Sequence, residues 1–326
     1  MRYILGVDLG GTNIVVGTVA ENGTQVLGVR SDSTRPEEGA DAVVGRIARL
    51  CQESIADAAA AGVPAIAISG VGIGSPGPLD REKGLVLITP NLGWTNFPLR
   101  ERVSAAIGLP ATLDNDANCA VLGEWWMGAG RGSRYLVGMT IGTGIGGGIV
   151  IDGRLYHGAS DAAGEIGHTT IDSTGRRCKC GNYGCIEAYA SGPAIAARAV
   201  EGIEAGAESS LPGFVGGDLS RVTAQTVYEC AHAGDEYANE VVRDTAKFLG
   251  AGIANLINIF NPDTLVILGG VTLAGDRLFT PLRSEVKRRA FKPSVERCRI
   301  LPGELPGTAG VVGAAATFRN QTWGNG

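Results

Sequence analysis

Residues 135–153 read YLVGMTIGTGIGGGIVIDG, which indicates a strand, a glycine-rich turn, a second strand and an Asp-Gly hairpin turn. The start of the chain has the same organisation and leads to Asn22-Gly23, another strong hairpin signal. The two copies match at one constant offset in four residue pairs: Tyr3, Gly6, Leu9 and Gly10 with Tyr135, Gly138, Ile141 and Gly142. One hairpin module therefore occurs twice, about a domain apart, which indicates an internal duplication.

The glycine-rich turns of both copies are candidates for binding phosphate. Gly142, Gly144 and Gly147 formally match the dinucleotide fingerprint, but a strand follows where a Rossmann unit needs a helix. The chain also lacks the Gly-Lys-Ser/Thr of a Walker A motif. We interpret the turns as phosphate cradles of another kind, built from backbone amides and a threonine hydroxyl. The alternative is a pair of ordinary tight turns, and the repetition argues against it.

Residues 164–187 contain a complete set of zinc ligands, one imidazole and three thiols: His168, Cys178, Cys180 and Cys185. Four such ligands fill a tetrahedral shell and leave no position for a reacting water, so a structural zinc is expected. Gly181 and Gly184 supply the backbone freedom that the short Cys-x-Cys spacing needs. The acids Glu165 and Glu187 flank the cluster. Our hypothesis is that the zinc fixes this loop and the loop aims both acids at a polar ligand.

Two other interpretations of these cysteines fit the sequence less well than zinc does. A disulfide is disfavoured because the chain has seven cysteines, an odd number. Met1 also runs straight into a strand-like segment, so we expect no signal peptide, and a chain of this length can bury a core without disulfides. Cysteine as a small core residue fits the other four, which are scattered in apolar segments: Cys51, Cys119, Cys230 and Cys298. It does not fit three cysteines crowded into a polar, glycine-rich loop.

A second polar cluster, Asp114-Asn115-Asp116-Ala117-Asn118, follows the short strand expected at 111–113 and opens a helix. Asp116 is thereby placed at a strand-to-helix junction. It could be a plain N-cap, but Asp114 or Asn115 could serve equally well. Two acids and two amides within five residues exceed what a cap requires.

Composition limits the class of protein. The length of 326 residues suggests two domains. An apolar fraction of 44% is that of an ordinary soluble protein. The net charge of −5 argues against nucleic acid as a partner. No run of about 18 or more apolar residues exists, so no membrane span is expected and the protein is placed in the cytoplasm.

Hydrophobic periodicity predicts alternating strands and helices. Strands are expected at 3–9, 14–20, 24–30, 65–73, 85–88, 111–113, 135–141, 145–151, 265–268 and 298–301. Helices are expected at 38–61, after 114–118, at 187–205, 223–233, 236–260 and 276–290, and from 308 to before 320. Residues 206–222 are expected to form a flexible loop.

Five motifs together closely resemble the ROK family (repressors, open reading frames and kinases): Asp8-x-Gly10-Gly11-Thr12, Asn115-Asp116-Ala117-Asn118, Gly142-Thr143-Gly144-x-Gly146-Gly147-Gly148, Gly164-Glu165-x-Gly167-His168 and Cys178-x-Cys180-Gly181-x-x-Gly184-Cys185-x-Glu187. The resemblance spans nearly the whole chain. It implies an α/β fold, the duplicated actin/hexokinase-like (ribonuclease H-like) ATPase fold with two lobes and a central cleft. Residues 1–114 and 302–326 would form the smaller lobe, and residues 115–301 the larger lobe with the zinc loop.

Many repressors of the family carry a DNA-binding helix-turn-helix ahead of the first strand, for which a strand beginning at Tyr3 leaves no room. The chain therefore looks like a kinase, and the segments 74–78 and 91–94 look most like glucokinases of this family. The resemblance implies transfer of the ATP γ-phosphoryl group to the 6-OH of glucose, a reaction of glycolysis, with Asp116 as general base.

The resemblance also implies ligands. Asp8 would hold Mg²⁺ through water. Nucleotide contacts would come from the glycine turns: Gly10, Gly11, Thr12, Asn13, Gly142, Thr143, Gly144, Gly269 and Gly270. The sugar would contact Gly77, Asn91, Asn115, Asp116, Glu165, His168 and Glu187. One ring nitrogen of His168 would bind zinc and the other would donate to a sugar oxygen. A homodimer or homotetramer whose lobes close on the sugar is expected.

Alternatives remain open at this point. The chain could be a kinase for mannose, fructose, allose or N-acetylmannosamine, or a non-catalytic sugar sensor of the same fold. Polyphosphate could replace ATP as the donor.

Overall fold

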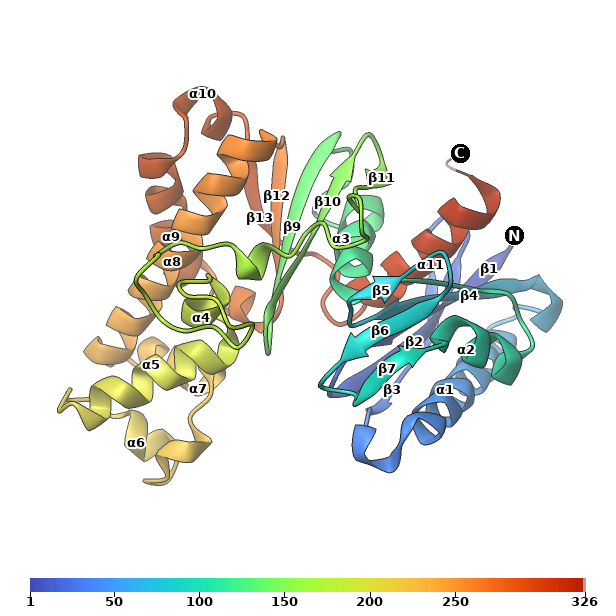
Figure 1. Ribbon diagram of the computed structural model, residues 1–326, viewed down its shortest axis with the longest axis horizontal. Coiled ribbons are helices and arrows are strands. Elements are labelled where there is room, and N and C mark those ends of the chain that lie inside the picture. Colours follow the sequence, from blue (N-terminus) through green and yellow to red (C-terminus); the bar gives the residue numbers. More distant parts are fainter. Residues whose placement is uncertain (325–326) are drawn as a thin grey trace. The chain divides into compact units, whose positions relative to one another are not determined.

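The computed structural model describes residues 1–324, which form two five-stranded sheets of the same strand order (Figure 1). The first has the order β3-β2-β1-β4-β8, with strands Val26–Ser33, Asn13–Ala20, Tyr3–Leu9, Ile68–Ser75 and Ala111–Asn115. The second has the order β11-β10-β9-β12-β13, with strands Arg154–Leu155, Ile145–Ile151, Tyr135–Ile141, Thr264–Leu268 and Arg299–Pro302. Each copy of the repeated hairpin occupies the same place in its sheet, so the duplication read from the sequence is confirmed.

The pairing directions show how the first sheet is assembled. β1 pairs antiparallel with β2 from Tyr3↔Ala20 to Leu9↔Ile14. β1 also pairs parallel with β4, and β4 pairs parallel with β8. A smaller sheet combines β5 (Leu79–Asp80), β6 (Leu85–Thr89) and β7 (Trp94–Phe97). Parallel strands end at a common edge, and β8 ends there at the predicted polar cluster.

The helices within the described residues divide between the two compact units into which the chain groups. The first comprises α1 (Ala40–Ala60), α2 (Leu99–Ile107), α3 (Asp116–Met127) and α11 (Ala309–Trp323). The second comprises α4 (Glu187–Ala190), α5 (Gly192–Glu204), α6 (Leu211–Phe214), α7 (Ala224–His232), α8 (Glu236–Phe260), α9 (Asp276–Arg289) and α10 (Lys292–Val295). Short 3-10 turns lie at Pro36–Glu38, Ala65–Ala67, Ile166–His168, Leu219–Arg221 and Gly270–Ala274.

The described chain groups into two compact units. Unit 1 contains Met1–Leu136, Gly148–Gly164 and the chain from Glu304 onward, and unit 2 contains Val137–Gly147 and Glu165–Gly303. Residues 115–136 and 148–164 thus lie in unit 1, whereas the lobe division inferred above places them with the larger lobe. For residues 116–127 the reason is local packing, because α3 lies against α11 within unit 1. The lobe boundaries at 114 and 302 stay a prediction.

Glycines allow α11 to pack closely inside unit 1. A Cβ at Gly72 of β4 would lie 1.8 Å from the carbonyl oxygen of Ala314, and a Cβ at Gly313 would lie 1.5 Å from that of Cys119. Both contacts are with backbone, which cannot move aside as a flexible side chain can. The absence of side chains at these positions therefore sets how closely α11 approaches β4 and α3.

This packing makes a paired prediction about stability. Gly313→Ala should lower the free energy of unfolding by about 1–3 kcal/mol, because the backbone must shift. Gly45→Ala should raise it by roughly 0.5–1 kcal/mol, because alanine is the better helix former. Gly45 is exposed within α1, and no described heavy atom lies within 4 Å of a Cβ placed there. Urea unfolding of both variants measures the difference. Equal effects would contradict the close-packing account.

Several elements differ from those predicted. The helix expected at 187–205 is broken into α4 and α5, because Ser191 caps α5 by accepting from the amide of Ala194 and Pro193 follows in its first turn. The expected loop at 206–222 contains α6 and a 3-10 turn. The strand β7 and the helices α2 and α10 were not predicted. The last helix continues to Trp323, whose ring packs against Phe318 and the guanidinium of Arg2.

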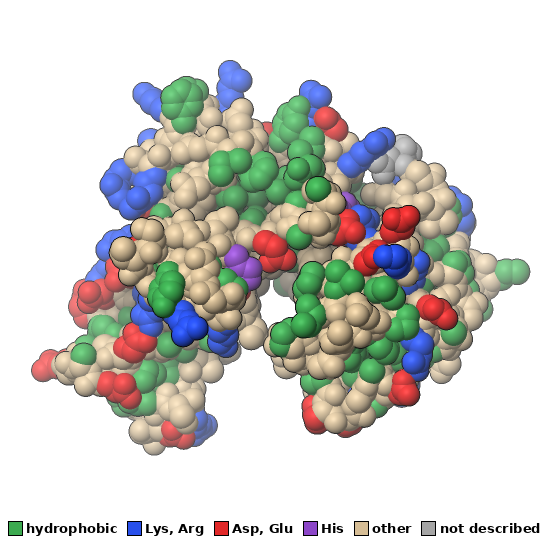
Figure 2. All heavy atoms as spheres, viewed as in Figure 1, with side chains coloured by type: hydrophobic (Ala, Val, Ile, Leu, Met, Phe, Trp, Pro, Cys, Tyr) green, Lys and Arg blue, Asp and Glu red, His purple; other side chains and the backbone are tan. Residues whose placement is uncertain are grey.

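The described chain carries no helix with both the length and the apolar character that crossing a membrane requires. Charged side chains of both signs are interspersed on the face shown in Figure 2. Many form exposed pairs, such as Arg30 with Asp57 and Lys83 with Asp80. Pairs of this kind contribute little to stability in water.

Candidate active site

Asp116 is the first residue of α3 and follows β8 directly. The N-cap of α3 is Asn115, whose side-chain oxygen accepts a hydrogen bond from the amide of Asn118 at 3.1 Å. One oxygen of Asp116 accepts from the amide of Ala117 at 2.8 Å. Because Asn115 caps the helix, the interpretation of Asp116 as a plain N-cap is not needed. The side chain is partly exposed, at the end of the helix where the macrodipole stabilises negative charge.

Asp8 lies on β1 in the same unit and is electrostatically coupled to Asp116. Burial and the negative charge of Asp116 raise the pKa of Asp8 to about 7. The carboxylate fits against the first turn of α11 because residue 310 is glycine, where a Cβ would lie 2.2 Å from Oδ2 of Asp8. Unit 1 thus brings together the two acids singled out from the sequence. A cation at this place would favour the ionised form of Asp8.

The turn between β1 and β2 presents unused backbone donors. The amide of Gly10 bonds to the carbonyl of Asn13 at 2.8 Å. Within the described chain, the amides of Gly11 and Thr12 make no hydrogen bond. Successive unused amides in a turn can bind an anion, which is what a phosphate cradle requires.

Three other sugar-site candidates lie close to these residues in unit 1. Asn91 lies against the first turn, since a Cβ at Gly11 would be 3.4 Å from Cβ of Asn91. Gly77 lies beside Asn115, since a Cβ at Gly77 would be 3.7 Å from its Nδ2. The candidates of unit 1 therefore form one connected group.

Sequence reasoning missed the charged cluster around Asp114, two residues before Asp116. Asp114 is fully buried. Its carboxylate lies 3.0 Å from Nε of Arg81 and 3.0 Å from Nε2 of His157. Arg81 also lies 3.4 Å from the carboxylate of Asp161. These partners are 30 to 50 residues away along the chain, and no local pattern indicates that they meet.

In unit 2, a pocket of about 890 Å³ adjoins the second glycine turn. Its lining includes Gly142, Thr143 and Gly270, three of the residues predicted to contact nucleotide. Gly269 sits behind them, where a Cβ would lie 2.0 Å from the carbonyl oxygen of Ile141. Within the described residues, the amides of Thr143 and Gly144 make no hydrogen bond. The second turn thus offers the same kind of unused donors as the first.

The wall of this pocket also contains residues that sequence reasoning missed. One face of α7 contributes residues at the helical spacing i, i+3, i+4 and i+7: Gln225, Tyr228, Glu229 and His232. Val271, Leu273 and Ala274 supply apolar surface, with Arg277 of α9 beside them. The helical spacing was visible in the sequence, but nothing there indicated which face of α7 meets a ligand.

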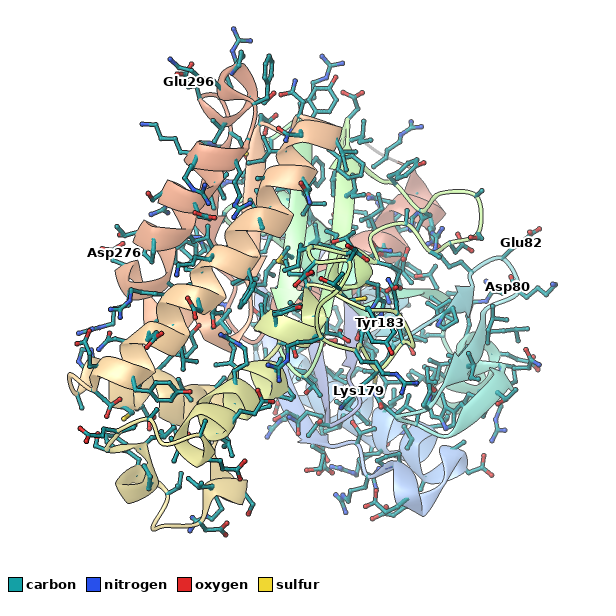
Figure 3. All side chains as sticks on the ribbon, turned by 60° about the vertical axis from the view of Figure 1, so that its left-hand side comes forward. Asp80, Glu82, Lys179, Tyr183, Asp276 and Glu296 are labelled. Atoms are coloured by element: carbon teal, nitrogen blue, oxygen red, sulfur yellow. The ribbon has the colours of Figure 1, made fainter. Side chains whose placement is uncertain are left out.

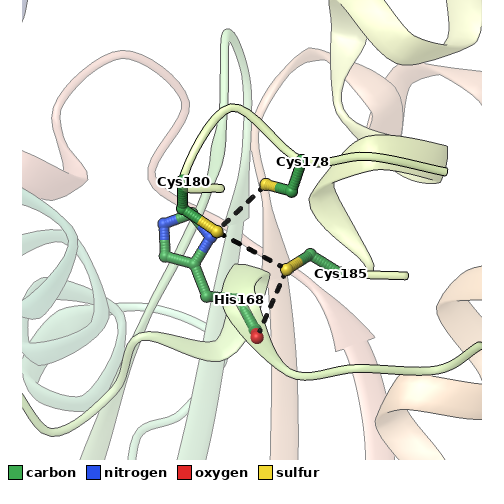
Figure 4. Close-up of side chains that lie close together, drawn as sticks. All are labelled: His168, Cys178, Cys180 and Cys185. Carbon is green, nitrogen blue, oxygen red and sulfur yellow. Dashed lines mark hydrogen bonds between the residues drawn. The ribbon is translucent and has the colours of Figure 1, made fainter. Parts of the chain in front are cut away.

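The four predicted metal ligands meet in unit 2 (Figure 4). Their ligand atoms, on His168, Cys178, Cys180 and Cys185, all lie within 4.8 Å of one another. The sulfurs of Cys180 and Cys185 are 3.7 Å apart. That separation is close to the roughly 3.8 Å between two thiolates on one tetrahedral zinc and far beyond the roughly 2.05 Å of a disulfide. All the cysteines are free thiols. The cluster can therefore hold a metal ion.

The loop geometry agrees with the roles predicted for its glycines. Gly181 and Gly184 have φ of 96° and 72°, and a Cβ at Gly184 would lie 1.6 Å from the carbonyl oxygen of Asp172. Lys179 and Tyr183, labelled in Figure 3, lie on this loop and are exposed. The thiols of Cys178 and Cys185 are buried, whereas Cys180 is exposed.

His168 presents its two ring nitrogens to different partners. Nδ1 lies 3.8 Å from the sulfur of Cys178, and Nε2 lies 4.0 Å from a carboxylate oxygen of Glu165. Glu165 itself is 59% exposed. The arrangement leaves Nδ1 for a metal and Nε2 on the side of the exposed acid, as the double role inferred for His168 requires.

Glu187, the second flanking acid, is already engaged. Its Oε2 accepts a hydrogen bond from the amide of Ile145 at 2.9 Å, and its Oε1 lies 3.8 Å from the sulfur of Cys178. The loop that carries the metal ligands is therefore bonded directly to the second glycine turn. Its expected contact with a sugar stays a prediction.

The ROK family model matches residues 4–321 of this chain. The chain belongs to the ROK family. A glucokinase of Thermotoga maritima is 38% identical to this ROK protein over 322 residues, which are 98% of each chain. A glucokinase of Halalkalibacterium halodurans is 36% identical, with 98% of this chain and 96% of the relative covered. The crystal structure of a ROK family glucokinase from Streptomyces griseus in complex with glucose and AMPPNP matches with a TM-score of 0.83 at 35% identity, covering 97% of this chain and 98% of that one.

These comparisons confirm the fold inferred from the motifs. This ROK protein has the actin/hexokinase-like fold of ROK sugar kinases, with mixed α/β sheets. The duplication explains that fold, since each copy of the hairpin begins one of the two equivalent five-stranded sheets.

Proposed function

We propose that this ROK protein is an ATP-dependent hexose kinase, a glucokinase that transfers the γ-phosphoryl group of ATP to the 6-OH of glucose. The observation that carries the proposal is the pair of acids in unit 1: Asp116 at the start of α3 and Asp8 on β1, close enough for one to raise the pKa of the other. Similarity over nearly the whole chain to glucokinases of T. maritima and H. halodurans supports glucose as the acceptor.

In this proposal Asp116 is the general base that accepts the proton of the attacking hydroxyl. The N-terminus of α3 stabilises the ionised carboxylate, and its hydrogen bond from Ala117 holds one oxygen in place. Proton removal of this kind typically contributes about 10²–10⁴-fold to the rate. The remaining acceleration would come from positioning and charge neutralisation, on which phosphoryl transfer mostly depends.

Each unit carries a glycine turn that could contact the nucleotide. Unused amides of Gly11 and Thr12, and of Thr143 and Gly144, would donate to phosphate oxygens. The pocket beside Gly270 would take the adenosine, with the α7 face as one wall. Mg²⁺, when bound, neutralises charge on the phosphates, and Asp8 would hold it through water. The high pKa of Asp8 fits this, because such a carboxylate gains most from a nearby cation.

Each unit, taken by itself, offers polar groups that could contact the sugar. Unit 1 would contribute Asn91, Asn115 and Asp116, with Gly77 approaching closely. Unit 2 would contribute Glu165, His168 and Glu187. We propose that the Cys/His cluster holds Zn²⁺, since three thiols and one imidazole at tetrahedral spacing fit that ion. Its role would be structural: it fixes the loop that carries all three residues of unit 2.

A coupled assay that detects ADP release tests this function directly. Glucose, mannose, fructose, allose and N-acetylmannosamine are compared as acceptors, with ATP and polyphosphate as parallel donors. We expect kcat/KM for glucose with ATP to exceed that for every other pair by about tenfold or more, because losing or displacing one buried hydroxyl contact costs at least that. Sugar binding without turnover would reject the kinase assignment, and a different best acceptor would reject glucose.

A further inference from the structure

Two hydrogen bonds in unit 2 clamp the glycine turn between β9 and β10 to the segment that leaves the metal loop. The carboxylate of Glu187 accepts from the amide of Ile145 at 2.9 Å. The amide of Gly192, the first residue of α5, donates to the carbonyl of Gly142 at 2.9 Å. The two bonds grip opposite ends of the turn and leave the amides of Thr143 and Gly144 between them unused.

On the side that Glu187 approaches, the turn has room for the carboxylate because residue 144 is glycine. A Cβ at Gly144 would lie 2.7 Å from Oε2 of Glu187, too close for the carboxylate to stay where it is. Gly144 has no left-handed φ, so an alanine there is not strained by its backbone. Gly144 is therefore needed because it leaves room for the carboxylate of Glu187, and not because the turn requires a backbone conformation that only glycine adopts.

We propose that Glu187 is a positioning residue for the nucleotide: it holds the turn Gly142–Gly144 in the conformation that presents its amides to phosphate. This proposal rests on the proposed function, and it connects the metal loop with the phosphate-binding turn. Glu187 follows Cys185 by two residues, and its other oxygen faces the thiol of Cys178. A change in the metal loop therefore reaches the phosphate-binding turn through one side chain. Sugar and nucleotide affinities are then coupled, and coupling of this kind acts in both directions.

The test measures binding of AMPPNP with Mg²⁺ by calorimetry, in the absence of sugar, to the metal-loaded full-length protein. Glu187→Ala should weaken AMPPNP binding about tenfold or more, the typical loss for a hydrogen bond to a charged group. Glu187→Gln should stay within about threefold of wild type, since the amide oxygen can still accept from Ile145. Glu240→Gln is the matched control: it removes an exposed carboxylate of α8 in the same unit that does not line the pocket, and should leave AMPPNP affinity unchanged.

Gly144→Ala tests the same contact without touching the metal loop, so it remains informative if Glu187→Ala loses metal. It should weaken AMPPNP binding by a similar factor, because the new methyl group displaces the carboxylate. The double variant should be no weaker than Glu187→Ala within about twofold, since both changes break one contact.

Additive effects would mean that the methyl group obstructs phosphate directly and would overturn the proposal. So would metal-loaded Glu187→Ala binding AMPPNP as wild type does while its sugar KM rises, which is the result expected if Glu187 contacts only sugar. Failure of the wild-type protein to bind AMPPNP or to turn over glucose would instead overturn the proposed function.

Discussion

Asp116→Asn lowers kcat for glucose phosphorylation by about 10²–10⁴-fold, the usual contribution of a general base, and leaves glucose binding measurable. Asparagine has the same size and can still accept the hydrogen bond from the amide of Ala117. It cannot take the proton of the attacking hydroxyl at neutral pH. The pKa of Asp8 should also fall toward its usual range, because the charge of Asp116 is one of the two causes that raise it.

Steady-state kinetics together with calorimetric titration of glucose separate the catalytic loss from a binding loss. Glu82→Gln is a suitable control, since Glu82 is an exposed carboxylate of the same unit (Figure 3) and lies outside both groups of candidates. Its kcat should equal that of wild type. Turnover in Asp116→Asn within tenfold of wild type would remove Asp116 from the role of base.

Cys180→Ser is the second substitution with a large expected effect. Cys180 is exposed, so exchanging its sulfur for oxygen removes a metal ligand without leaving a cavity in the core. We expect the metal content to fall close to zero, the melting temperature to drop and the KM for glucose to rise about 10–100-fold. That range is typical when the support of a site is lost but its contact residues remain. Metal analysis, thermal unfolding and steady-state kinetics measure the three effects.

Cys298→Ser provides the matched control, because Cys298 lies outside the cluster and is partly buried. It should keep its metal and the KM of wild type. A metal-free Cys180→Ser protein with an unchanged KM would show that the loop needs no ion to bind the sugar.

Much of this architecture could be predicted from the sequence because it depends on residues that lie close together along the chain. The duplication could be recognised from the repeated hairpin, because the two strands and the turn of each copy are contiguous in the sequence. The metal cluster could also be predicted, because three of its four ligands lie within eight residues of one another in the sequence. Asp116 could be located because a strand leads directly into a helix there.

The features that escaped prediction depend on contacts between distant parts of the chain. Arg81 and His157 meet at Asp114 only after β8 and the segment following β10 are folded into unit 1. Which face of α7 lines the pocket is decided by its packing in unit 2, not by its own sequence. The bond from Glu187 to Ile145 spans 42 residues, and its donor is a backbone amide, which no residue type signals. The break between α4 and α5 was the exception, since Ser191-Gly192-Pro193 is a readable helix stop and start.

A crystal structure of the full-length protein with glucose and AMPPNP tests the central claim most directly, through the distance between the Asp116 carboxylate and the 6-OH of glucose. This account predicts hydrogen-bond contact, about 2.6–3.2 Å, with the thiols of Cys178, Cys180 and Cys185 around one metal ion. Glucose bound with its 6-OH out of reach of Asp116 and against another base would contradict it.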